Sequence, residues 1–205
     1  MKHHLRKEMK ERLAAITFTQ AKAKSYAACE ALIKLPEFLN ARVVMLYLPI
    51  PHEMDTAEIA LHAWQQGKVV LAPKVNWAQR HMLAVQINSL DDGLEDGGHG
   101  VRQPVAGEPW PVEEIGLVIV PALAYDARGG RLGRGGGFYD RFLAEQGMDA
   151  VKCGLGFHEQ VVDELPMHSH DWPVDLLVTD QCVRRFRENN RSAGPGAASE
   201  EGRQA

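Results

Sequence analysis

The chain has 205 residues, a length that suits one domain and excludes two large ones. Hydrophobic residues make up 45% and charged residues 24%, which excludes wholesale disorder and allows a sizeable core. Lysines and arginines number 23 against 27 acidic residues, so the formal net charge of −4 excludes a global basic field for nucleic acid. Any anion-binding site must therefore be local.

The cysteines and the apolar runs indicate the compartment. Cys29, Cys153 and Cys182 lie far apart and form neither a disulfide pattern nor a zinc motif. The longest apolar runs, 43–50 and 116–125, reach about half of the roughly 20 residues that a membrane-spanning helix needs. Charges interrupt the first residues, where a secretory signal would be apolar. We expect a cytoplasmic protein with no membrane partner.

The first 40 residues predict two helices. Apolar side chains recur every three or four residues from Leu5 to Ile16, with charged residues between them, as in an amphipathic helix on a core. Thr19 is expected to cap a second helix that continues to Lys34, and Pro36 limits its extension.

The next part of the chain predicts a strand, a helix and a strand. Residues 43–48 form a compact apolar run rich in β-branched side chains, which is typical of a buried strand. Asp55 or Thr56 is expected to cap a helix through Trp64, and 69–72 is the next apolar run. A weaker strand is predicted at 81–87. Residues 88–114 are rich in glycine and proline and predict a long surface excursion.

The remaining pattern repeats the alternation of strand and helix. Strands are predicted at 117–120, 152–157 and 176–179, with a helix at 138–146 after a glycine-rich segment. The expected fold class is α/β, with an open, mostly parallel sheet flanked by helices in three layers. One domain is expected over 1–187. Residues 188–205 contain no large apolar side chain and predict a disordered tail.

The glycine-rich segment 129–137 carries the clearest chemical signal. Its glycines lack Cβ atoms, so backbone N–H groups can approach a ligand closely. Arg131 and Arg134 add guanidinium groups that match phosphate oxygens. A polyphosphate site at the carboxyl end of a strand is the prediction. The glycine spacing fits neither a P-loop nor a dinucleotide fingerprint, and a flexible loop with two solvated arginines is the alternative.

Two carboxylates are candidates for a Mg²⁺ site. Mg²⁺ prefers one or two carboxylates together with phosphate oxygens and water, which Asp140 and Asp175 could supply. Asp140 begins the predicted helix, where an acid also complements the helix dipole. Position alone favours that capping role for Asp140 and an ordinary surface location for Asp175.

Other polar residues leave their roles open. Glu53 follows the first strand and is a candidate acceptor for a polar heterocycle, whereas Asp55 is expected to cap the helix. Lys2 and Arg6 stand one helical turn apart, which suits an anion, but spacing alone favours a solvated face. The His-Ser-His-Asp run at 168–171 has no further metal ligands at a familiar spacing and is expected to be a surface loop.

Two segments together resemble a known family. VPALAYD at 120–126 and RLGRGGGFYD at 131–140 resemble the signature of the 5-formyltetrahydrofolate cyclo-ligases, also called 5,10-methenyltetrahydrofolate synthetases. Supporting pieces follow in the family's order, among them Lys2-x-x-Leu5-Arg6, Glu53-x-Asp55-Thr56 and Gly154-x-Gly156-Phe157. The resemblance extends from Lys2 to about Thr179. Gly136 departs from relatives that carry lysine there, and Gln103 stands where the family often has glutamate.

The resemblance implies an ATP- and Mg²⁺-dependent ligase of folate metabolism that converts 5-formyltetrahydrofolate to 5,10-methenyltetrahydrofolate, ADP and phosphate. The ATP-binding residues it implies are Lys2, Arg6, Arg131, Leu132, Gly133, Arg134, Gly135, Gly136, Gly137, Phe138 and Tyr139. Arg131 and Arg134 would be catalytic. Leu48 and Glu53 would lie against the folate, and Asp140 and Asp175 would hold the metal.

Two alternatives stay open at this point. One is an ATP-using relative whose ligand is not a folate, and the other is a non-catalytic protein that binds 5-formyltetrahydrofolate. Arg131, Arg134 and Asp140 are all present, which favours the enzyme. No obligate protein partner and no nucleic-acid partner are indicated.

Overall fold

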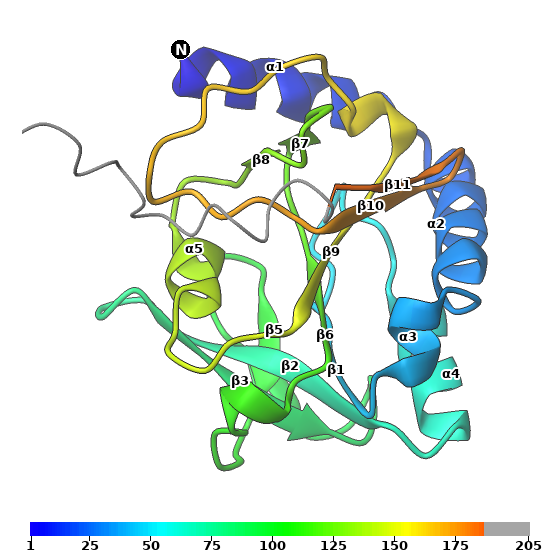
Figure 1. Ribbon diagram of the computed structural model, residues 1–205, viewed down its shortest axis with the longest axis vertical. Helices are drawn as coiled ribbons and strands as arrows, with labels where there is room; N and C mark the ends of the chain where they lie inside the picture. The colour runs from blue at the N-terminus through cyan, green and yellow to red at the C-terminus, as the bar shows by residue number, and fades with distance from the viewer. Residues whose placement is uncertain (187–205) are drawn as a thin grey trace, which may run out of the picture.

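The computed structural model describes residues 1–186, and the statements below concern that part of the chain. Seven strands form the central sheet in the order β11-β10-β9-β6-β1-β2-β3 (Figure 1). Every pairing from β10 to β2 is parallel. Antiparallel pairings add β3 at one edge and β11 at the other. The predicted single-domain, mostly parallel α/β fold is confirmed, while the predicted tail at 188–205 lies outside the described residues.

The sheet strands follow the predicted apolar runs closely. Three predictions, for 81–87, 117–120 and 176–179, are confirmed residue for residue. The strand bounds are β1 Val43–Met45, β2 Val69–Asn76, β3 His81–Ile87, β6 Leu117–Val120, β9 Val151–Gly156, β10 Leu176–Thr179 and β11 Val183–Arg185. All residues of β1, β6 and β10 are buried, because helices or loops cover both faces of a parallel sheet.

The helices are α1 Lys2–Ala14, α2 Phe18–Leu32, α3 Pro36–Asn40, α4 Ala57–Gln65 and α5 Phe138–Leu143. The prediction that Thr19 caps α2 is wrong. Thr17 caps it instead, since its hydroxyl accepts a hydrogen bond from Gln20 N while the Gln20 side chain accepts one from Thr17 N. Pro36 does more than limit α2, because it begins the short helix α3. No helix of residues 1–186 is long and apolar enough to cross a membrane.

Two apolar clusters fill the two sides of the sheet. Side chains alternate along β1, so Val44 joins the cluster that contains Phe38 of α3, and Val43 joins the cluster that contains Phe142 of α5. Helices α1 to α4 contribute to the first cluster and α5 to the second. Figure 1 shows α5 apart from α2, α3 and α4, with the sheet between them. The predicted three layers are therefore present.

Short strands and single-turn helices lie within the connections that the sequence predicts to be irregular. β4 Leu94–Asp96 pairs with β5 Arg102–Pro104 inside the predicted surface excursion. β7 Ala124–Tyr125 pairs with β8 Arg131–Leu132 just before the glycine loop. Single-turn helices occupy Val112–Glu114 and His158–Gln160. Strands of two or three residues are too short to leave an alternating pattern in the sequence.

Asp126 holds the glycine-rich connection in place. This carboxylate is buried, and its Oδ1 accepts hydrogen bonds from Arg128 N and Gly130 N, each at 2.8 Å. Its Oδ2 accepts one from Leu165 N at 3.0 Å. One side chain thus satisfies the β7–β8 turn and joins it to the segment near residue 165, which fixes where the following glycine loop begins.

We expect Asp126→Ala to lower the free energy of unfolding by about 3 kcal/mol, because it leaves three backbone N–H donors without their acceptor. Urea denaturation monitored by tryptophan fluorescence measures the loss. Asp126→Asn keeps an oxygen for the turn but turns an NH₂ toward Leu165 N, so its loss should be intermediate. Equal stability of the alanine variant and the wild type would contradict the proposed bracing role.

Candidate functional site

A pocket of about 1160 Å³ opens where β1 and β6 end. Its walls include Leu48 after β1 and Ala122 after β6, together with the β2–β3 turn, the glycine loop, α1 and residues 168–172. Ligands of open α/β sheets usually bind at the carboxyl ends of the strands. A site for one drug-sized ligand typically has a volume of about 300–1,000 Å³, so this pocket has room for more than one small substrate.

The glycine loop, residues 133–137, forms one wall of the pocket between β8 and α5. Gly135 and Gly137 have φ values of +111° and +67°, a region that L-residues rarely adopt. The loop therefore needs glycine for its shape as well as for access. At Gly136 a Cβ would stand 2.7 Å from the Phe138 ring, so a larger residue would force this ring to move.

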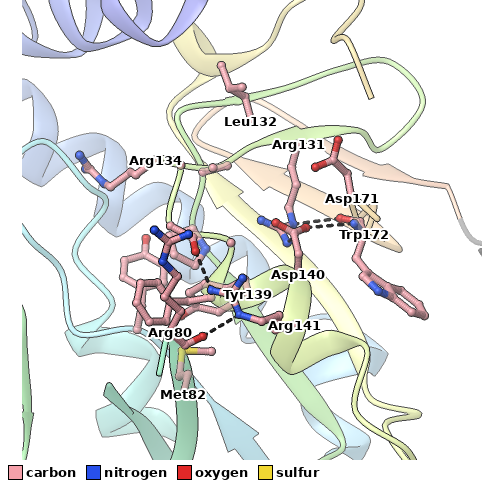
Figure 2. A pocket seen from close by; sticks show the side chains of 18 of the residues that line it. Arg80, Met82, Arg131, Leu132, Arg134, Tyr139, Asp140, Arg141, Asp171 and Trp172 are labelled. Carbon is pink, nitrogen blue, oxygen red and sulfur yellow. Dashed lines mark hydrogen bonds and ion pairs between the residues drawn. The ribbon is translucent and has the colours of Figure 1, made fainter. Parts of the chain in front are cut away.

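Arg131 links three segments at the base of the pocket. Its side chain is only 3% exposed. Its Nη2 donates to Asp140 Oδ1 at 2.6 Å, and its Nε donates to the Trp172 carbonyl at 2.9 Å (Figure 2). Asp140 Oδ1 also accepts a hydrogen bond from Trp172 N at 3.1 Å. β8, the start of α5 and the 168–172 segment are thereby fixed relative to one another.

Arg134 and Glu53 form a second ion pair in the pocket, with 2.9 Å between Nε and Oε1. The Glu53 side chain is 11% exposed and the Arg134 side chain 37% exposed. Burial raises the pKa of Glu53 above its ordinary value, although Arg134 and Ile50 N act in the opposite direction. The pair joins the glycine loop to the segment that follows β1, which brings together two residues that lie far apart in the sequence.

Tyr139 has a buried hydroxyl that lacks a hydrogen-bond partner within the described residues. The residue lines the pocket beside the two ion pairs. Burial raises the pKa of its phenol, so the hydroxyl stays protonated and available as a donor. Buried polar groups are rarely left unsatisfied in proteins, so this donor is free to bond a water or ligand oxygen in the pocket.

Helix α1 brings Lys2 and Arg6 to the pocket, where spacing alone favoured a solvated face. Arg6 Nε donates to the Gly133 carbonyl at 2.9 Å, and Lys2 Nζ lies 2.5 Å from Asp171 Oδ2. The predicted surface loop at 168–171 is confirmed, since residues 168–170 are exposed and irregular, and this loop also lines the pocket and anchors Lys2. The tertiary contact with α1 leaves no local signal in the sequence.

The two predicted metal ligands lie in different surroundings. Asp140 lines the pocket, and its Oδ1 accepts both hydrogen bonds of the side chain, so within residues 1–186 Oδ2 accepts none. Asp175 Oδ2 accepts from Lys152 N at 2.8 Å and lies 3.6 Å from Lys152 Nζ, and this residue does not line the pocket. No group of three or more His, Cys, Asp or Glu residues in 1–186 suits a metal. One carboxylate oxygen beside phosphate oxygens fits Mg²⁺.

The other predicted residues also reach the pocket. Leu48 is buried against it, and Leu132 and Phe138 belong to its lining. Asp55 does not line the pocket; it precedes Thr56, the N-cap residue of α4, and its Oδ1 accepts from Ala57 N at 2.9 Å. The pocket therefore gathers Leu48, Glu53 and all predicted ATP-binding residues, although their roles stay predictions.

Sequence reasoning missed one end of the pocket. Trp77, Arg80, His99 and Arg141 line it there, from the β2–β3 turn, the loop after β4, and α5. Among these four residues, only Arg141 had a local signal for a place in the site, because it directly follows the signature segment at 131–140. The remaining three come from connections whose course the sequence does not predict.

Comparison with known proteins supports the resemblance. Residues 1–180 match the model of the 5-formyltetrahydrofolate cyclo-ligase family. The chain is 28% identical over 187 residues to the 5-formyltetrahydrofolate cyclo-ligase of Mus musculus, covering 86% of this chain and 92% of the relative. It is 34% identical over 147 residues to that of Mycolicibacterium smegmatis, covering 69% and 75%.

A solved structure extends the similarity to the fold. The NMR structure of Aquifex aeolicus 5,10-methenyltetrahydrofolate synthetase superposes with a TM-score of 0.79 at 32% identity, covering 98% of this chain and 99% of that one. The family model covers every residue that lines the pocket and all strands of the sheet except β11. The chain belongs to the 5-formyltetrahydrofolate cyclo-ligase family.

Proposed function

We propose that this enzyme converts 5-formyltetrahydrofolate and ATP to 5,10-methenyltetrahydrofolate, ADP and phosphate. The observation that carries the proposal is the Arg134–Glu53 pair, which joins the glycine loop to the segment after β1 within one pocket. A phosphate-binding loop and a buried acceptor for a heterocycle therefore face the same space. The pocket volume of about 1160 Å³ suits two substrates together.

ATP would bind with its phosphates along the glycine loop. Backbone N–H groups of a glycine-rich segment can reach phosphate oxygens directly. Arg6 and Arg134 add cationic groups on this loop, and Lys2 stands on the same face of α1 as Arg6. Mg²⁺, when bound at Asp140, would offset negative charge on the phosphates. Asp175 remains a prediction from the family resemblance.

The folate would lie against Leu48 and Glu53. Both residues line the pocket immediately after β1, and Leu48 offers an apolar surface for a flat ring. An ionised Glu53 accepts hydrogen bonds from N–H groups of the reduced heterocycle. Glu53 is largely buried, so its carboxylate has already lost most of its hydrogen bonds to water. Hydrogen bonds from the folate would take their place.

The reaction follows from placing the formyl oxygen near the γ-phosphate. That oxygen attacks phosphorus, the new O–P bond forms, and the bond from phosphorus to the bridging oxygen of ADP breaks. N10 then attacks the activated formyl carbon and loses its proton, and the C–O bond breaks to release phosphate. Arg134 would stabilise charge on the moving phosphoryl group, and the Tyr139 hydroxyl would donate to an oxygen of the reacting centre.

A cytoplasmic location is part of the proposal. Cys29, Cys153 and Cys182 are free thiols in the structure, which suits a reducing compartment. ATP and reduced folates are available there as substrates. No protein partner is needed for the proposed reaction, because both substrate regions come from one chain.

Replacing Arg134 tests the catalytic proposal. We expect Arg134→Ala to lower turnover by on the order of 10³-fold, by analogy with other arginines that stabilise phosphoryl transfer. Absorbance of the methenyl product with and without ATP measures the rate. Arg134→Lys keeps the charge for Glu53 and should recover part of the activity. Near-normal turnover of the alanine variant would rule out the proposed role.

The metal site is tested by two matched variants. Asp140→Asn should raise the Mg²⁺ concentration for half-maximal activity at least about tenfold, since it removes the pocket carboxylate. Asp175→Asn removes the same charge beside Lys152 and should change this concentration less. Titrating Mg²⁺ at saturating ATP gives both values. An equal rise for the two variants would favour the family-implied pair over Asp140 alone.

The raised pKa of Glu53 predicts a pH effect on folate binding. As pH falls through the folded-state pKa, which lies above the ordinary value of 4.5, the carboxylate gains a proton and loses an acceptor. The KM for 5-formyltetrahydrofolate should therefore rise on the acid side. Glu53→Gln should have a higher KM that lacks this acid limb. Rates against pH, corrected with an ATP-free blank, provide the measurement, and an identical limb in both proteins would assign it to another group.

A further inference from the structure

Lys152 is a lysine whose side chain is only 12% exposed, although it lies outside the pocket lining. It is the second residue of β9 and pairs in register with Val118 of β6, which belongs to the apolar cluster on the α5 side of the sheet. Side chains paired across parallel strands point to the same face, so Lys152 lies on that side as well. An ammonium group in such a place is costly unless other groups compensate its charge.

Three groups compensate the Lys152 ammonium. Its Nζ lies 3.6 Å from Asp175 Oδ2, donates to the Ala150 carbonyl at 3.2 Å, and lies 5.6 Å from the centre of the Trp172 ring. A cation over the face of an indole is attracted by the ring's quadrupole, and the attraction is stronger where water is excluded. Lys152 therefore interacts with both ends of the short segment 172–175.

Trp172 contributes its backbone to the pocket and its ring to Lys152. The Trp172 N–H donates to Asp140 Oδ1 at 3.1 Å, and its carbonyl accepts from Arg131 Nε at 2.9 Å. Figure 2 shows the indole pointing away from these two residues. Pro173 follows and confines the Trp172 backbone to extended conformations, so the ring and the two backbone groups keep a narrow range of relative positions. Fixing the ring therefore helps to fix both backbone groups.

The Trp172 N–H in turn fixes how the Asp140 carboxylate is rotated. Asp140 Oδ1 accepts hydrogen bonds from both Trp172 and Arg131, whereas within residues 1–186 Oδ2 accepts none. With Oδ1 held at two points, Oδ2 is left available as a ligand for Mg²⁺ beside a nucleotide phosphate. Groups that hydrogen-bond to a ligating carboxylate strongly influence the affinity for the metal.

We propose that Lys152 is a positioning residue for nucleotide-bound Mg²⁺, acting through the Trp172 ring on the Asp140 carboxylate. The inference rests on the proposed function, because it takes Asp140 as the metal ligand. In this arrangement the Asp175 carboxylate balances the charge of the lysine and keeps it against the ring. A residue outside the pocket thus sets an affinity inside it.

Lys152→Met tests the inference, because methionine keeps a flexible side chain and removes the charge. Titration calorimetry of the full chain with ADP, once with Mg²⁺ and once with EDTA, gives the factor by which Mg²⁺ tightens ADP binding. We expect the variant to lower this factor roughly fivefold, less than the roughly 10–100-fold typical of groups that bond a metal ligand directly. The Kd with EDTA should stay unchanged. Lys152→Arg keeps a cation that can stack on the indole and should restore most of the factor.

Lys68→Met is the matched control. Lys68 Nζ also donates to carbonyls, those of Leu39 and Ala41, and lies 5.1 Å from the centre of the Phe38 ring. Lys68 lies outside the pocket lining too, but Phe38 belongs to the apolar cluster on the other side of the sheet. The control removes the same charge and the same kind of ring contact, and it should leave the Mg²⁺ factor unchanged.

Trp172→Leu tests the same contact from the other side, because it removes the ring and keeps both backbone groups. This variant should also lower the Mg²⁺ factor. The double variant with Lys152→Met should fall no further than the weaker single variant, since both substitutions remove one interaction. Effects that multiply in the double variant would show that Lys152 does not act through the ring, which would overturn the inference.

Two results for Lys152→Met would also overturn the inference. An unchanged Mg²⁺ factor would show that the lysine has no influence on the metal site. A larger factor would show that Lys152 withholds Asp175 from the metal. If the wild type bound no ADP, with or without Mg²⁺, the result would contradict the proposed function itself, and the inference with it.

Discussion

The buried guanidinium of Arg131 is the constraint on which the pocket depends. It sits at 3% exposure between Asp140 and the Trp172 carbonyl, so the two sides of the glycine loop and the distant segment at 172 meet on one side chain. Removing one member of such a group leaves a charge or a carbonyl buried without its partner, which is far more costly than losing an exposed pair. The same contact places the Asp140 carboxylate at the glycine loop. The Arg131–Asp140 pair therefore both stabilises the pocket and positions the carboxylate proposed to bind the metal.

Much of the fold could be predicted from local patterns, and the failures have a physical explanation. Buried strands such as β6 are continuous apolar runs, which the sequence displays directly. β11 was missed because an exposed edge strand such as Val183–Arg185 owes its existence to pairing with β10. Thr17 and Thr19 are both acceptable caps, and only the reciprocal bond with Gln20 decides between them.

Some residues of the site could be predicted from the sequence, and others could not. The glycine loop could be predicted as part of the site because its composition is so rich in glycine. Lys2 and Arg6 were predicted only from the family resemblance, and α1 does bring both to the pocket. The 168–172 segment is held at the pocket by bonds to Lys2, Arg131 and Asp140, contacts that no spacing encodes. Asp175 is the reverse case: a residue named by resemblance is engaged with Lys152, outside the pocket lining.

The departure at Gly136 is consistent with its surroundings. Its absent side chain leaves room that the Phe138 ring occupies, since a Cβ there would stand 2.7 Å from the ring. The ring in turn supports the Arg141 guanidinium, which donates to the Gly136 carbonyl. A lysine at this position would force the ring to move, and with it the arginine. In this chain α5 therefore adds a cation beside the loop, in addition to Arg134 of the loop itself, and that cation lines the pocket together with Arg80 and Trp77.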